Sequence, residues 1–64
     1  MSQQEFIYVN KCAQKYAANR GMELIQWTDL GNDLLEVIMG DASDPIFVPV
    51  QCVTIDKHLL CAKQ

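Results

Sequence analysis

The sequence predicts a small α+β domain, in which an N-terminal helix packs on a three- or four-stranded antiparallel β-meander. Apolar residues recur at three- and four-residue steps only near the N-terminus, which is typical of a helix. Short β-rich runs follow, separated by turn residues. Such short loops join neighbouring strands in antiparallel order, so the helix has one sheet to cover. Residues 1–64 are expected to form a single domain.

The first element is predicted to be a helix over residues 3–20. Ser2-Gln3-Gln4-Glu5 matches a capping box, in which the serine side chain accepts from the Glu5 amide and the glutamate side chain reaches back. Gly21 suits the left-handed residue that ends a helix. The helical face that we expect in the core is apolar and consists of Phe6, Val9, Ala13, Tyr16 and Ala17.

Two strands are predicted next, over residues 22–28 and 34–39. The turn-rich segment 29–33 separates them. Residues 34–39 also fit a single helical turn, but their short length between two glycine-containing turns favours a strand.

The C-terminal part is predicted to contain a long strand and a short one. A turn at residues 40–45 precedes a β-rich run over 46–55, which Pro49 interrupts. Because proline cannot donate to a β-ladder, this strand is expected at a sheet edge, or bulged or bent at the proline. After a turn at 56–57, residues 58–62 are expected to form a last short strand.

Charge is distributed unevenly along the chain. No lysine or arginine lies between Arg20 and Lys57, and all five basic residues lie in the two flanks. Such separation bears on partners and association rates rather than on fold. We expect the middle of the chain to form an acidic surface that attracts a protein with a basic surface. Its residues are Glu23, Asp29, Asp33, Glu36, Asp41 and Asp44.

The predicted strands are apolar on both sides, which indicates an interface. In the second strand, Leu34 and Ile38 face one way, whereas Leu35, Val37 and Met39 face the other. One helix covers one side of such a sheet, so the other side is expected to meet a second copy in a homodimer. A strongly curved sheet that wraps its own core is the alternative. On the helix, a partner-binding patch is expected off the core face, at Ile7, Tyr8, Lys11 and Lys15.

The three cysteines, Cys12, Cys52 and Cys61, predict reduced thiols in a cytoplasmic protein. Their number is odd, no C-x-x-C spacing occurs, and no basic segment followed by an apolar run opens the sequence. No apolar run approaches the roughly 20 residues of a membrane-spanning helix, so no membrane contact is expected.

Catalytic, metal and cofactor sites are not expected. His58 is the single histidine, and its spacing to Cys52 and Cys61 matches neither a nucleophile signature nor a zinc site. The acidic turns lack the later ligands of a calcium loop, and basic residues split between two ends make a poor footprint for direct nucleic-acid binding.

These exclusions favour a small non-enzymatic intracellular regulator or inhibitor that acts by protein–protein binding. Its size is typical of accessory proteins of phages or mobile elements, with which this chain is expected to be associated. One alternative is a homo-oligomeric structural or assembly subunit. Another is an acidic nucleic-acid mimic that occupies a basic surface of a target protein.

Overall fold

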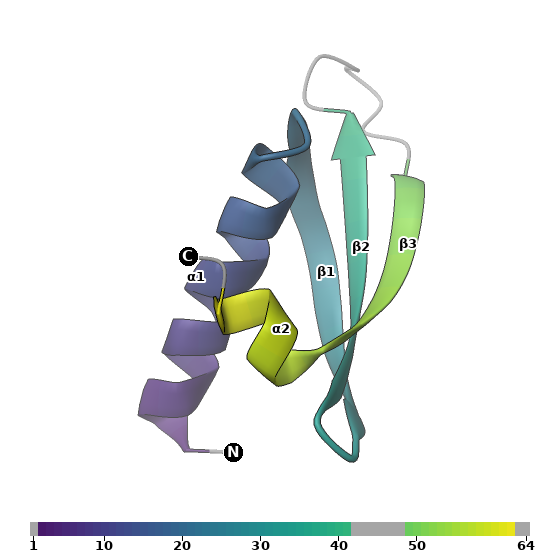
Figure 1. The fold of residues 1–64 in the computed structure, drawn as a ribbon. Helices are drawn as coiled ribbons and strands as arrows, with labels where there is room; N and C mark the ends of the chain where they lie inside the picture. Colours follow the sequence, from purple (N-terminus) through teal and green to yellow (C-terminus); the bar gives the residue numbers. More distant parts are fainter. Residues whose placement is uncertain (1, 42–48, 63–64) are drawn as a thin grey trace.

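The computed structural model describes residues 2–41 and 49–62. Within them an antiparallel sheet has the strand order β1-β2-β3, and two helices lie on one of its faces (Figure 1). The elements in chain order are α1 (Gln3–Ala18), β1 (Met22–Gly31), β2 (Leu34–Asp41), β3 (Pro49–Asp56) and α2 (Lys57–Ala62). The predicted α+β arrangement is therefore confirmed, with three strands in the described part of the chain.

Helix α1 begins and ends close to the predicted residues. The Ser2 hydroxyl accepts from the Glu5 N–H at 3.1 Å and so caps the first turn. The Glu5 carboxylate is directed to the Lys57 ammonium group on α2. At the other end Asn19 is the C-cap and Gly21 has a φ of +71°, which a residue without a Cβ adopts at little cost.

The core lies between α1 and the central strand β2. Leu35, Val37 and Met39 are fully buried on the side of β2 that faces the helices. The small side chains of Ala13 and Ala17, also fully buried, allow α1 to pack closely against them. The faces predicted for β2 are therefore confirmed.

Phe6 was predicted in this core, and that prediction is wrong. Its side chain is 53% exposed, and its ring lies 5.0 Å from the Trp27 ring at a tilt of 39°. Phe6 lies in the first turn of α1, at the margin of the core, and is not part of the buried clusters formed by Val9 and the residues after it. The buried face of α1 consists of Val9, Cys12, Ala13 and Ala17.

A β-bulge reverses the alternation of β1. Leu24 pairs with Met39 and Trp27 pairs with Val37, whereas Ile25 has no partner in the register. Because the bulge adds one residue, both Leu24 and Trp27 face the helices although an odd number of steps separates them.

The β1–β2 turn is tighter than predicted. Strand β1 continues to Gly31, which pairs with Leu34, so the turn contains only Asn32 and Asp33. Both have positive φ, 54° and 62°, as a type I′ hairpin turn requires. Asn and Asp tolerate this conformation better than other residues with a Cβ.

Strand β3 lies at the edge of the sheet, one of the positions expected for a strand that contains a proline. Pro49 is the first described residue of an edge strand, and the register shifts where it pairs with Gly40. Residues 42–48, which include most of the predicted turn, Asp44 and the start of the predicted strand, lie outside the described residues.

The last strand, predicted over residues 58–62, is wrong: this segment belongs to helix α2. The Asp56 carboxylate accepts from the His58 N–H at 2.8 Å, which stabilises the first turn. The Lys57 N–H donates to the Asp33 carbonyl at 2.7 Å. Leu60 then enters the core beside Val9 and Leu35. Neither described helix has the length and apolar character that crossing a membrane requires.

Candidate functional site

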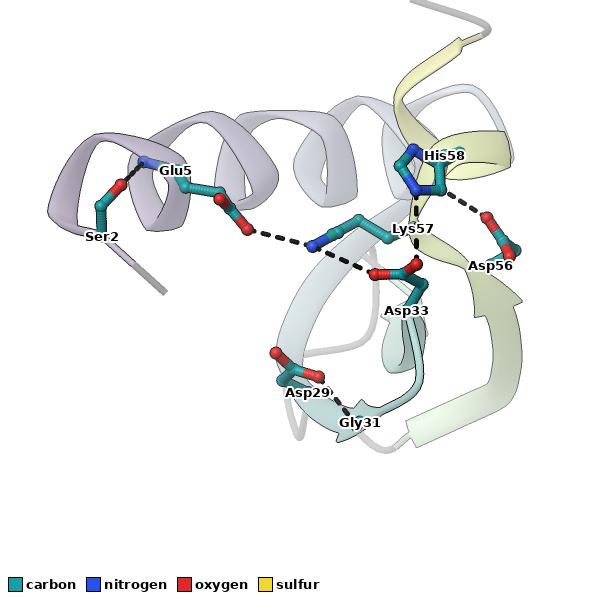
Figure 2. A network of polar contacts seen from close by, with 8 residues as sticks. All are labelled: Ser2, Glu5, Asp29, Gly31, Asp33, Asp56, Lys57 and His58. Carbon is teal, nitrogen blue, oxygen red and sulfur yellow. Dashed lines mark hydrogen bonds and ion pairs between the residues drawn. The ribbon is translucent and has the colours of Figure 1, made fainter.

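A polar network ties α2 to the β1–β2 turn and to α1 (Figure 2). The Lys57 ammonium group lies 3.0 Å from a Glu5 oxygen and 3.6 Å from an Asp33 oxygen. The other Asp33 oxygen lies 3.5 Å from Nε2 of His58, whose side chain is 76% exposed. The type I′ turn positions Asp33 for these contacts, because it directs both its carbonyl and its carboxylate towards α2.

The charges of this network favour a structural role for Lys57. A hydrogen bond to Glu5 is the main cause that raises the pKa of Lys57, and the negative charges of Glu5 and Asp33 add to it against an opposing effect of burial. The lysine thus has counter-ions on both sides. It fixes the position of α2 rather than offering a free cation.

Tyr8 lies between two surface hollows. The first, of about 400 Å³, lies beside the contact between α1 and α2 and is lined by Glu5, Tyr8, Val9, Lys57, His58, Cys61 and Ala62. The second, of about 500 Å³, runs along the outer side of α1 and is lined by Tyr8, Lys11, Cys12, Gln14, Lys15 and Ala18. The Tyr8 side chain belongs to both and is 54% exposed.

We call the exposed α1 residues Ile7, Tyr8, Lys11 and Lys15 the Tyr8 surface. Three of these predicted partner-binding residues line the same hollow, whereas Ile7 is 47% exposed and lines neither hollow. Within the described ranges, no carboxylate pairs with Lys11 or Lys15. The structure therefore brings together an aromatic side chain, two lysines and a hollow.

Among the described residues, the acidic side chains do not gather on one surface. Asp33 is paired with α2, and the Asp29 carboxylate accepts from the N–H of Gly31, two residues further along β1, at 2.9 Å. Glu23 and Glu36 are directed to the sheet face that the helices leave uncovered. Asp41 ends β2, and Asp44 lies outside the described residues.

Two of the three free thiols lie beside Tyr8, at the contact between α1 and α2. Burial, followed by a hydrogen bond to Cys12, raises the pKa of Cys61 to about 12. The neighbouring Cys12 sulfur, then that of Cys61, raises the pKa of the Tyr8 hydroxyl. These shifts keep both Cys61 and Tyr8 protonated near neutral pH, the opposite of what an activated thiol nucleophile requires.

The positions of the third cysteine and of the possible metal ligands give little support to a thiol pair or a metal site. Cys52 is on the uncovered face of the sheet, so it does not share a site with Cys61. Among residues 2–41 and 49–62, no cluster of three or more His, Cys, Asp or Glu side chains has the arrangement of a metal site.

Sequence reasoning missed the contribution of α2 to this region. Lys57, His58 and Cys61 reach the first hollow only because residues 57–62 are helical. The one available signal was Asp56 directly before this segment, since Asp is a favoured helix N-cap residue. Comparison with protein-family models, curated proteins and solved structures gave no match.

Proposed function

We propose that this chain is a non-enzymatic regulator that binds another protein through the Tyr8 surface. The observation that carries the proposal is the position of Tyr8, half-exposed between two hollows and beside two lysines that pair with no carboxylate of residues 2–41 and 49–62. Tyrosine combines a large apolar area with a polar tip, and it is enriched among residues that dominate binding energy. The two hollows offer space for side chains of a partner on either side of the ring.

The charge of the Tyr8 surface favours an acidic partner at this site. Lys11 and Lys15 are one helical turn apart, and both are exposed. Their attraction for a carboxylate speeds encounter and is screened by salt. The expectation of a basic partner, which came from the acidic middle of the chain, applies to a different surface, because Glu23 and Glu36 lie on the opposite side of the sheet from α1.

The experiment compares which proteins are captured from the native host by the wild-type chain and by surface variants. Tyr8→Ala and Lys15→Glu are expected to lose the partner, with affinity reduced by about tenfold or more for a residue at the centre of an interface. Thr28→Ala is the matched control, because Thr28 is exposed on the uncovered sheet face. Circular dichroism verifies that each variant is folded.

Capture of the same partner by all four proteins would reject the Tyr8 surface. Loss with Thr28→Ala alone would transfer the binding site to the sheet.

A further inference from the structure

The sheet face that points away from both helices forms a second surface, which we call the outer sheet face. Since Leu35, Val37 and Met39 are buried under the helices, the alternate residues of β2 and their cross-strand partners lie on the outer side. Its principal side chains are Glu23, Leu34, Glu36, Ile38, Cys52 and Thr54.

This face is partly apolar and carries negative charge only. Leu34 is 39% exposed, and Ile38 lies in the middle of the central strand. Polar Gln26 and exposed Cys52 flank Ile38 on the neighbouring strands, so the apolar area is narrower than the sequence predicted. No lysine or arginine lies in β1, β2 or β3.

The charges argue against a symmetric dimer through the outer sheet face. A two-fold contact places the same patch of both copies face to face. Glu23 and Glu36 of each copy would then share one interface with their equivalents, and like charges placed together oppose association. The occupant that fits this face is one with basic residues beside apolar ones.

The opposite side of the same domain has that composition. The sheet and the helices form two layers, so the outer side of α1 and the outer sheet face point in opposite directions (Figure 1). The Tyr8 surface combines Ile7 and Tyr8 with two exposed lysines. The two surfaces are also similar in length. Ile7 to Lys15 spans about 12 Å of helix, and Glu36 to the position opposite Glu23 spans about 14 Å of strand.

From this complementarity we infer that the chain associates head to tail with a second copy, the outer sheet face of one contacting the Tyr8 surface of the next. Such a contact does not close on itself after two copies, so it generates rings or open chains whose size grows with concentration. Self-association also covers Tyr8, and it therefore competes with an external partner. The inference does not require such a partner.

Sedimentation velocity over a micromolar-to-millimolar concentration series, with reducing agent present because Cys52 is exposed, tests the contact. We expect association at low salt and its loss between about 0.01 M and about 1 M salt, over which the screening length falls from about 30 Å to about 3 Å. The charge-reversal pairs Lys11→Glu/Lys15→Glu and Glu23→Lys/Glu36→Lys are each expected to weaken self-association by more than about tenfold.

Mixing the two variants provides the decisive measurement. Lys11→Glu/Lys15→Glu carries negative charge on both surfaces, and Glu23→Lys/Glu36→Lys carries positive charge on both. Neither variant is therefore expected to assemble alone, whereas an equimolar mixture is expected to form chains in which the two variants alternate. Self-association of Lys11→Glu/Lys15→Glu equal to that of wild type would overturn the inference, because a symmetric sheet contact does not use these lysines. A wild-type monomer throughout the low-salt series would also overturn it.

If Glu23→Lys/Glu36→Lys fails to fold, the milder Glu23→Gln/Glu36→Gln replaces it and is expected to weaken association in the same direction. Unchanged association of that folded variant would count against the contact. A wild-type chain that remains monomeric but binds a host partner through Tyr8 would reject self-association alone and leave the proposed function intact.

Discussion

The two helices cover the same face of the sheet, yet they depend on different contacts. Helix α1 has 16 residues, a serine cap of its own and four buried side chains. Helix α2 has six residues and one buried side chain, Leu60. Isolated helices shorter than about 12–15 residues are marginal in water. Helix α2 therefore exists because α1 and the β1–β2 turn are already in place, and it should detach more readily than any other helix or strand described.

Among the changes that test how α2 is held, truncation of Leu60 should reduce stability the most. Leu60 is fully buried against Val9, Cys12, Ala13 and Leu35, and we expect Leu60→Ala to reduce the free energy of unfolding by about 2–5 kcal/mol. Its neighbour provides the control, since Leu59 is 57% exposed and Leu59→Ala should change stability by no more than about 0.5 kcal/mol. Urea unfolding followed by Trp27 fluorescence measures both. Equal losses would show that α2 is not anchored by Leu60.

This difference also explains why the sequence predicted helix α1 correctly but not helix α2. The apolar period, Ser2 and Gly21 are local signals, and together they predicted α1 to within about two residues at its C-terminal end. Helix α2 carries one core residue in six, so no apolar period could distinguish it from a strand. Its helical state depends on Asp33, far away in sequence, whose carbonyl accepts from the Lys57 N–H.

The same reasoning applies to the sheet and the candidate site. From Leu34 to Met39, strand β2 alternates between buried and more exposed residues, as an unbulged strand does, so its two faces were predictable from the sequence. In β1 the bulge at Ile25 shifts the alternation, and only the paired structure directs the Trp27 indole N–H to the Asn10 side chain at 2.9 Å. The exposed residues of the Tyr8 surface followed from the helical period, whereas the hollow beside α2 required the position of a helix that had been predicted as a strand.

Phe6 provides a second, smaller effect, on the α1 side of the comparison. Because this ring is half-exposed and its aromatic contact is with Trp27, Phe6→Ala should cost about 0.5–1.5 kcal/mol for the aromatic pair plus part of the burial energy. Core burial would have predicted about 3–5 kcal/mol. Phe6→Leu is the control, since it keeps apolar area but removes the ring. Thermal or urea unfolding measures the change. If Phe6→Ala reduces the free energy of unfolding as much as Leu60→Ala does, Phe6 is part of the core after all.

The smallest expected effect is a loosening of α2 at alkaline pH. The pKa of Cys61 is raised from 9.0 to about 12 in the folded chain. A thiol whose pKa is raised by folding stabilises the fold below its unfolded value, and this contribution is lost as the pH rises through 9 towards 12.

Lys57 acts in the same direction at higher pH. Its pKa is raised above 10.5 by Glu5 and Asp33, so its charged form stabilises the fold below that pH, and the contribution disappears above it. Hydrogen exchange of the α2 amides should accelerate from about pH 9 upwards, relative to the intrinsic rate, before the sheet amides do so.

Two variants separate these contributions to the opening of α2. Cys61→Ala should remove the part that begins near pH 9, and Lys57→Met should remove the part above pH 10.5 while increasing exchange of the α2 amides at neutral pH. Lys11→Met is the control for loss of a lysine, because Lys11 has no ion-pair partner among the described residues. If α2 and the sheet exchange together at every pH in all of these proteins, α2 is an integral part of the cooperative fold and the contrast between the two helices fails.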